Sequence, residues 1–138
     1  MYKTALIFLC AVLFTACDKT NNSDCPSLIC TENFAMVTFS FTNKDGVGVG
    51  IKNYSAVNQR TGDTIKTSGI ASLTLVAGTY VVVDDNYVKK LSEEGDDIKV
   101  SGTLEATNQT KTAILKVSGG KCACHIEKIS GPEQVAFD

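Results

Sequence analysis

Hydrophobic and polar residues alternate along much of the chain after residue 33. Between Ala35 and Phe41 every second residue is apolar, while Thr38 and Ser40 are polar. Alternation with a period of two is typical of a β-strand that buries one face. It predicts a strand over residues 34–42, with Ala35 and Phe41 among the inward-facing residues.

Short apolar segments continue to the end of the chain, and turn residues such as Asp45-Gly46 and Gly119-Gly120 separate them. The pattern predicts further strands over residues 54–59, 64–67, 71–76, 80–84, 98–104, 111–117, 121–129 and 135–137. No segment after residue 33 keeps the helical period of 3.6 residues. About seven to nine short strands at this spacing predict an all-β fold, an antiparallel β-sandwich of immunoglobulin-like type.

Two kinds of segment have the composition of ligand-binding loops but lack the required spacing. Glycines alternate with apolar residues over 46–51, yet no Gly-Lys-Ser/Thr sequence follows, so we expect a loop or weak edge strand and no phosphate-binding loop. Acidic residues cluster at 84–86 and 93–97 without the spacing of an EF-hand. We interpret them as solvated loops and not as a calcium site.

The first 16 residues have the layout of a secretory signal peptide. Lys3 precedes an apolar run from Ala5 to Phe14, and small residues follow the run. The run is shorter than the about 20 residues that a transmembrane helix needs. Phe14-Thr15-Ala16-Cys17 resembles the lipobox of bacterial lipoproteins, and polar sequence follows it at once.

The resemblance implies that residues 1–16 are removed and that Cys17 becomes the acylated N-terminus. Residues 17–33 would then form the lipidated end and a tether, and residues 34–138 the β-sandwich domain. Several acyl chains hold a protein firmly on a bilayer, so the partner implied at Cys17 is the membrane of the bacterial cell envelope, at the periplasmic or the surface-exposed face of the outer membrane. Asp18 only partly matches the acidic export signal of Bacteroidetes-type lipoproteins, which leaves the leaflet open.

Composition excludes some classes of function. The chain has 13 Lys and Arg against 15 Asp and Glu, so nothing predicts the basic patch that nucleic-acid binding requires. It contains no tryptophan and four tyrosines, so an aromatic platform for a sugar would be small. We expect no cofactor.

Four cysteines remain after the leader and the lipidation site, namely Cys25, Cys30, Cys122 and Cys124. An even number in an exported protein predicts disulfides. On a strand, Cys122 and Cys124 would share a face with Cα atoms roughly 6.6 Å apart, which disfavours a bridge between them. We therefore expect Cys25 and Cys30 each to pair with one of the other two, in either order. Each bridge should stabilise the domain by about 4–5 kcal/mol.

The same segment offers an alternative, a metal site. Cys122, Cys124 and His125 lie within four residues and have the ligand chemistry of zinc or copper(I). Structural zinc sites prefer wider cysteine spacing, and on a strand His125 would point away from both cysteines. Catalysis by a thiol or by a Ser-His-Asp triad would also depend on His125, and no nucleophile elbow occurs. We therefore expect disulfides and no enzymatic activity.

Three segments resemble the carboxypeptidase-regulatory-like and transthyretin-like domains. They are residues 37–41, the Lys44-Asp45-Gly46 turn and residues 75–83, with Ala77 where those domains usually have proline. The resemblance implies a transthyretin-like β-sandwich without catalytic activity that serves in folding, docking or adhesion. Asp63-Thr64-Ile65 is similar to the short pattern on which Bacteroidetes-type bacteria attach O-glycans, which makes Thr64 a candidate for glycosylation.

Together these features predict a non-enzymatic, membrane-anchored envelope lipoprotein that acts as a binding, adhesion or assembly module. Its partner would be another envelope protein or a glycan. The alternatives are a metal-handling lipoprotein and a glycan-binding accessory protein.

Overall fold

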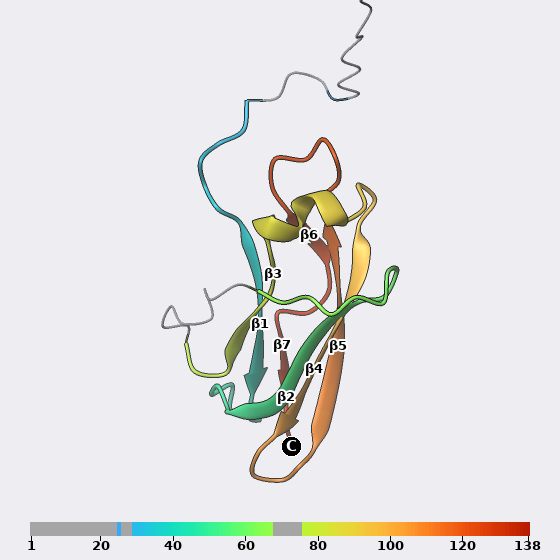
Figure 1. Ribbon diagram of the computed structural model, residues 1–138. Coiled ribbons are helices and arrows are strands. Elements are labelled where there is room, and N and C mark those ends of the chain that lie inside the picture. The colour runs from blue at the N-terminus through green and yellow to red at the C-terminus, as the bar shows by residue number, and fades with distance from the viewer. Residues whose placement is uncertain (1–24, 26–28, 68–75) are drawn as a thin grey trace, which may run out of the picture.

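The computed structural model describes residue 25 and residues 29–67 and 76–138 of the chain. These residues form seven strands and one short 3₁₀ helix (Figure 1). The elements are β1 (Met36–Thr42), β2 (Ile51–Asn58), β3 (Thr79–Asp84), η3 (Asp85–Lys90), β4 (Asp96–Leu104), β5 (Thr110–Ser118), β6 (Glu127–Ser130) and β7 (Gln134–Ala136).

The strands form two sheets that make a sandwich-like domain (Figure 1). One sheet has the order β3-β1-β7 and the other the order β2-β4-β5-β6. All pairs are antiparallel except β1 and β7, which run parallel. The prediction of an all-β sandwich is confirmed. The parallel pair adds a feature that hairpin spacing alone did not predict.

The core is built from the inward faces of both sheets. Phe41 on β1 is fully buried, and its ring centroid lies 5.1 Å from that of Phe39, 5.8 Å from that of Tyr80 and 6.0 Å from that of Phe137. The fully buried aliphatic residues are Val82, Val83, Ile98, Val100, Leu115 and Val117. The inward face predicted for β1 from the alternation of residues is therefore confirmed.

Two glycines let separate chain segments touch near the end of β1. Gly78 has a φ of 80°, and a Cβ atom there would lie 2.5 Å from the carbonyl oxygen of Phe41 and 2.7 Å from the nitrogen of Val49. A Cβ atom on Gly48 would overlap the carbonyl oxygen of Ala77. The glycine-rich segment over 46–51 was predicted as a loop or weak edge strand, and within it Gly48 allows this close backbone approach.

Several predicted strands differ from the observed ones. The strand predicted over 121–129 is wrong for its first half, because β6 begins only at Glu127 and residues 121–126 form a loop. The strand predicted over 64–67 is reduced to one bridge, between Thr64 and Val57. The strand predicted over 71–76 falls outside the described residues except for Val76, which is not in a strand.

The acidic segments are solvated only in part, and the prediction of solvated loops is wrong for Asp84 and Asp96. Asp84 is fully buried at the end of β3, where one oxygen of its side chain accepts the backbone N–H of Asn86 and caps η3. The other oxygen is buried and has no hydrogen-bond partner among the described residues. Asp96 is 3% exposed and begins β4, whereas Glu93 and Glu94 are exposed. Sequence composition alone does not distinguish the buried acids from the solvated ones.

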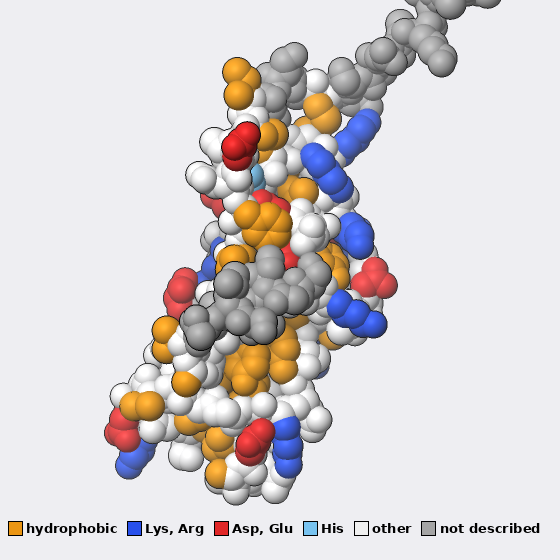
Figure 2. All heavy atoms as spheres, turned by 60° about the vertical axis from the view of Figure 1, so that its left-hand side comes forward, with side chains coloured by type: hydrophobic (Ala, Val, Ile, Leu, Met, Phe, Trp, Pro, Cys, Tyr) orange, Lys and Arg blue, Asp and Glu red, His pale blue; other side chains and the backbone are white. Residues whose placement is uncertain are grey.

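The domain has two distinct ends, which we call the arm end and the hairpin end, and they lie at the top and the bottom of both views (Figure 1 and Figure 2). The arm end carries the N-terminal arm (residues 29–35), η3 and the cysteine loop (residues 119–126). The hairpin end carries the turn between β4 and β5 and the last residue, Asp138. Among the described residues, no helix has the length and apolar character needed to cross a membrane.

Candidate functional site

Two disulfides join the N-terminal arm and its flank to the cysteine loop. Cys25 pairs with Cys122 and Cys30 pairs with Cys124, with Cα atoms 5.2 and 5.4 Å apart. The expected pairing between the two ends of the chain is confirmed, and the connectivity that the sequence left open is now defined. Two disulfides indicate an oxidising, extracytoplasmic environment.

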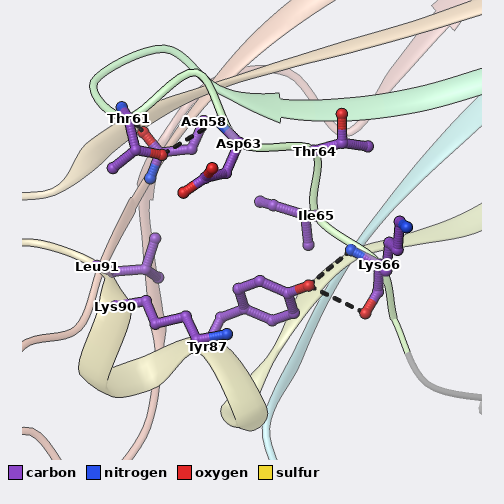
Figure 3. Close-up of a pocket in the computed structure, with 9 residues that line it drawn as sticks. All are labelled: Asn58, Thr61, Asp63, Thr64, Ile65, Lys66, Tyr87, Lys90 and Leu91. Carbon is purple, nitrogen blue, oxygen red and sulfur yellow. Dashed lines mark hydrogen bonds between the residues drawn. The ribbon is translucent and has the colours of Figure 1, made fainter.

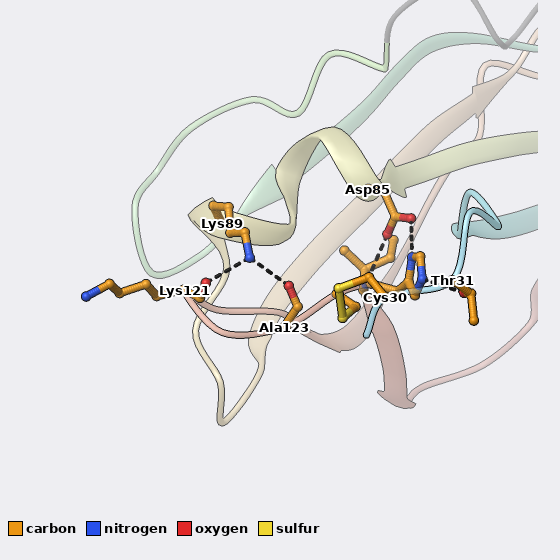
Figure 4. Close-up of a disulfide and its surroundings, with 9 residues drawn as sticks. Cys30, Thr31, Asp85, Lys89, Lys121 and Ala123 are labelled. Carbon is orange, nitrogen blue, oxygen red and sulfur yellow. Dashed lines mark hydrogen bonds and ion pairs between the residues drawn. A yellow bond between two sulfur atoms is a disulfide. The ribbon is translucent and has the colours of Figure 1, made fainter. Parts of the chain in front are cut away.

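Helix η3 holds the cysteine loop from its other side (Figure 4). The Lys89 ammonium group donates hydrogen bonds to the carbonyl oxygens of Lys121 and Ala123, each at 2.8 Å. A turn also closes the loop, with the N–H of Ala123 donating to the carbonyl oxygen of Gly120. Helix η3 therefore holds the loop that carries Cys122 and Cys124 through contacts that are independent of the disulfides.

Asp85, the first residue of η3, connects the arm to the cysteine loop (Figure 4). One of its carboxylate oxygens accepts the N–H of Ala35 at 2.8 Å and lies 2.7 Å from His125 Nδ1. The other accepts the N–H of Ile126 at 2.9 Å. On the far side of the imidazole ring, His125 Nε2 lies 2.9 Å from the hydroxyl of Thr31.

The surroundings of Asp85 keep it ionised. Burial raises the pKa of this carboxyl. Hydrogen bonds from the Ala35 N–H, from His125 and from the Ile126 N–H together lower it by more, so that the pKa lies below its ordinary value. An ionised carboxylate can only accept, so His125 donates through Nδ1. Thr31 then donates to Nε2 of a neutral imidazole or accepts from a charged one.

The order of hydroxyl, imidazole and carboxylate is that of a catalytic triad. Acyl transfer also needs donors for an oxyanion and a cleft for the substrate. Here the three side chains come from three segments: Thr31 from the arm, His125 from the cysteine loop and Asp85 from η3. Because the chain links these segments, we interpret it as a fastening of the arm.

The structure also bears on the metal alternative. Cys122 and Cys124 are both in disulfides, and His125 is held by Asp85 and Thr31. No group of three metal-ligating side chains occurs within residues 29–67, 76–138 or at residue 25. Because residues 121–126 form a loop, the argument that placed His125 and the two cysteines on opposite faces of a strand does not apply. The sequence did not predict that Asp85 is the partner of His125, although Asp85 lies in an acidic cluster that sequence analysis singled out.

A second polar cluster lies where β2 ends and β4 begins. The carboxylate of Asp96 accepts from Nε of Arg60 at 2.6 Å, from its terminal nitrogen at 2.8 Å, and from the amide of Asn58 at 2.6 Å. Arg60 also donates to the carbonyl oxygen of Lys90, which ties the β2 turn to η3. The hydrogen bonds from Arg60, against the opposing effect of burial, lower the pKa of Asp96 to about 2.

We expect this pair to control part of the acid sensitivity. The pKa of Asp96 is below its ordinary value of 3.8 in the folded protein, so its contribution is present above about pH 4 and lost as the pH falls through about 2. Its size is about 2 kcal/mol. Asp96→Asn should be less stable than the wild type by that amount at neutral pH, and the two should converge near pH 2. Chemical unfolding measured between those pH values tests this, and curves that stay parallel would contradict it.

A cavity of about 530 Å³ opens between the turn after β2 and helix η3 (Figure 3). Its walls combine apolar, aromatic and charged side chains. The lining residues are Asn58, Thr61, Asp63, Thr64, Ile65, Lys66, Tyr87, Lys90 and Leu91. Of these residues, sequence analysis quoted Asp63, Thr64 and Ile65 as a motif and proposed a role only for Thr64.

Tyr87 connects the two walls of this cavity (Figure 3). Its hydroxyl accepts the N–H of Lys66 at 2.7 Å and donates to the carbonyl oxygen of the same residue at 3.1 Å. The Lys90 ammonium group lies 4.8 Å from the centre of the Tyr87 ring, a cation–π contact. Thr64 is exposed at the edge of the cavity. Its glycosylation remains a prediction.

The observations define a small β-rich domain of two sheets that carries two disulfides. No protein-family model matches the chain, and neither a curated protein nor a solved structure matches it. The resemblances to bacterial lipoproteins and to transthyretin-like domains rest on sequence motifs alone and remain predictions. Cys17 and the leader lie outside the described residues.

Proposed function

We propose that the protein is a lipid-anchored binding module of the bacterial cell envelope, attached through Cys17, with no enzymatic activity. The observation that carries this proposal is the stapling of the N-terminal arm to one end of the sandwich by two disulfides. A domain held at the end of a lipid anchor gains from such a connection, because any pull on the anchor is transmitted to covalent bonds and not to a fraying strand.

The position of the disulfides supports one orientation of such a module relative to the membrane. Cys25 follows Cys17 by only eight residues and is fixed at the arm end. An extended chain spans at most about 3.6 Å per residue, so the arm end would lie within roughly 30 Å of the bilayer. The hairpin end would point away from the membrane. The side of the domain that holds the cavity remains accessible to a partner, which would be another envelope protein or a glycan.

The anchor is tested with a palmitate analogue that carries an alkyne, fed to bacteria that produce the full chain. We expect the wild type to be labelled and Cys17→Ala to be unlabelled. Cys10→Ala is the matched control, since this second leader cysteine is removed with residues 1–16 and its loss should leave labelling unchanged. The intact mass of the wild type should correspond to a chain that starts at Cys17 and carries acyl chains.

The opposite results contradict the proposal clearly. An unlabelled wild-type protein whose mass begins at another residue would show an ordinary secreted domain. Labelling that persists in Cys17→Ala would place the lipid elsewhere. In either case the disulfide-bonded fold would be unaffected, and the proposed lipid anchor at Cys17 would be wrong.

A further inference from the structure

We propose that the cavity between the turn after β2 and helix η3 binds a neutral saccharide, whose hydroxyl groups donate to the carboxylate of Asp63. The proposal names a ligand class for the binding module described above. It does not depend on the anchor at Cys17, so the two can fail separately.

The charges around the cavity favour a neutral ligand. Asp63 supplies one negative charge, and Lys66 and Lys90 supply positive ones. An anionic ligand would be attracted by the ammonium groups and repelled by the Asp63 carboxylate, and a cationic ligand would be attracted by this carboxylate and repelled by the ammonium groups. Burying an unpaired charge next to a like charge is unfavourable. A ligand that carries hydroxyl groups and no charge meets neither penalty and can use both signs.

The carboxylate of Asp63 is the free acceptor of the site. It points into the cavity in Figure 3, and its oxygens make no hydrogen bond or ion pair with another described residue. A carboxylate accepts from two neighbouring hydroxyls at once and such charge-assisted bonds are stronger than neutral ones. Thr61 accepts the N–H of Asp63, which leaves the Thr61 hydroxyl hydrogen to donate. The site therefore offers both acceptors and a donor to a polyol.

Apolar groups complete the match to a sugar ring. Ile65 and Leu91 are 7% and 4% exposed and contribute a small apolar wall, and Tyr87 contributes an aromatic ring. Sugars present C–H groups between their hydroxyls, so they suit a site with apolar walls and a few well-placed polar groups. The volume of about 530 Å³ lies within the range of about 300–1,000 Å³ for small-molecule sites.

The walls of the cavity are held in place without a ligand. The Tyr87 hydroxyl makes two hydrogen bonds to the backbone of Lys66 across the cavity. On the turn, the side chain of Asn58 accepts the N–H groups of Arg60 and Thr61. Preorganisation of this kind lowers the entropy lost on binding.

The test is an NMR titration of the full chain, produced under oxidising conditions, with glucose, galactose, mannose and N-acetylglucosamine. Glucosamine and galacturonic acid serve as the matched cationic and anionic probes. We expect at least one neutral sugar to shift the backbone amides of residues 61–66 and 87–91, with an affinity of about 1 mM as is usual for a small shallow site. Its charged analogue should bind more weakly.

Asp63→Asn tests the role of the carboxylate. The side chain is exposed and makes no hydrogen bond or ion pair within the part of the chain that the structure describes, so the variant should fold. We expect about a tenfold loss of affinity. Asp45→Asn is the matched control, because Asp45 is also exposed in a turn but lies remote from the cavity. Its affinity should equal that of the wild type.

Three outcomes would overturn the proposal. One is the absence of shifts with every neutral sugar at the highest soluble concentration, and another is shifts confined to residues outside the cavity. The third is equal affinity of Asp63→Asn and Asp45→Asn. Acyl labelling at Cys17 would be unaffected by any of these results, so failure here is distinct from failure of the anchored module.

Discussion

Replacing all four cysteines should destabilise the domain by about 7 kcal/mol, whereas removing either disulfide alone should cost about 2.5 kcal/mol. The loss on removing both is therefore expected to exceed the sum of the two separate losses. This differs from the sequence-based expectation, which treated each bridge as closing a long loop by itself.

The reason lies in the connectivity. Each disulfide spans a separation of more than 90 residues, 97 for Cys25–Cys122 and 94 for Cys30–Cys124. Once either one is formed, however, the other closes only the small ring of residues 25–30 and 122–124. In the chain-entropy model a loop of about 95 residues contributes about 4.7 kcal/mol and a ring of about nine contributes about 2.5 kcal/mol. Removing the first bridge therefore costs only the free energy contributed by the small ring, and removing the second costs the free energy contributed by the long loop.

Urea unfolding of the two paired variants and of the fourfold variant, all to serine, measures these losses. The stabilising osmolyte trimethylamine N-oxide keeps the fourfold variant folded enough to be measured. Cys10→Ser is the control for expression and handling, since residue 10 is absent from a processed chain. Two paired losses that add up to the fourfold loss or exceed it would contradict the linked-ring account.

Phe41→Ala should cost about 3–5 kcal/mol, the largest effect that we expect from a single side chain. Phe41 is 0% exposed, and its ring contacts Phe39, Tyr80 and Phe137 from β1, β3 and the C-terminal segment. Removing it leaves a cavity where the two sheets meet. A further ring, that of Tyr54 on β2 of the other sheet, lies 6.5 Å away. Because the rings around Phe41 belong to both sheets, the surrounding backbone cannot collapse into the space without breaking strand pairing.

The matched control is Phe34→Ala, at a position 47% exposed just before β1. We expect a loss of less than about 1 kcal/mol there, because a partly exposed side chain buries less apolar surface. Denaturant unfolding followed by circular dichroism measures both losses. Similar losses for the two variants would show that the core is not centred on Phe41.

Alternation of apolar and polar residues predicted β1 and most of β4 and β5 well. These strands bury one face against the other sheet, so burial itself imposes the period of two on the sequence. The pattern failed over residues 121–129, because the cysteines there are held by disulfides and by Lys89, and not by strand pairing. In a sequence pattern, a cysteine in a loop counts as an apolar residue and is taken for a strand residue when its disulfide partner is unknown.

The candidate sites were less predictable than the fold. The sequence marked His125 as a candidate metal ligand and the acidic cluster around Asp85 as a solvated loop, and the contact between these two residues was not foreseen. Asp85 and His125 are 40 residues apart in the chain, and Thr31 and His125 are 94 apart. Nothing in the local sequence around any of them encodes such a contact.

The residue pattern was sufficient to predict the all-β class, the inward faces of the main strands and the pairing of two early cysteines with two late ones. These follow from local periodicity and from the limits of disulfide geometry. The fold was needed to establish which cysteine pairs with which, that Asp96 is buried against Arg60, and that Asp63 and Tyr87 face one cavity. Those features depend on how distant segments pack, and packing is set by the whole core and not by neighbours in the chain.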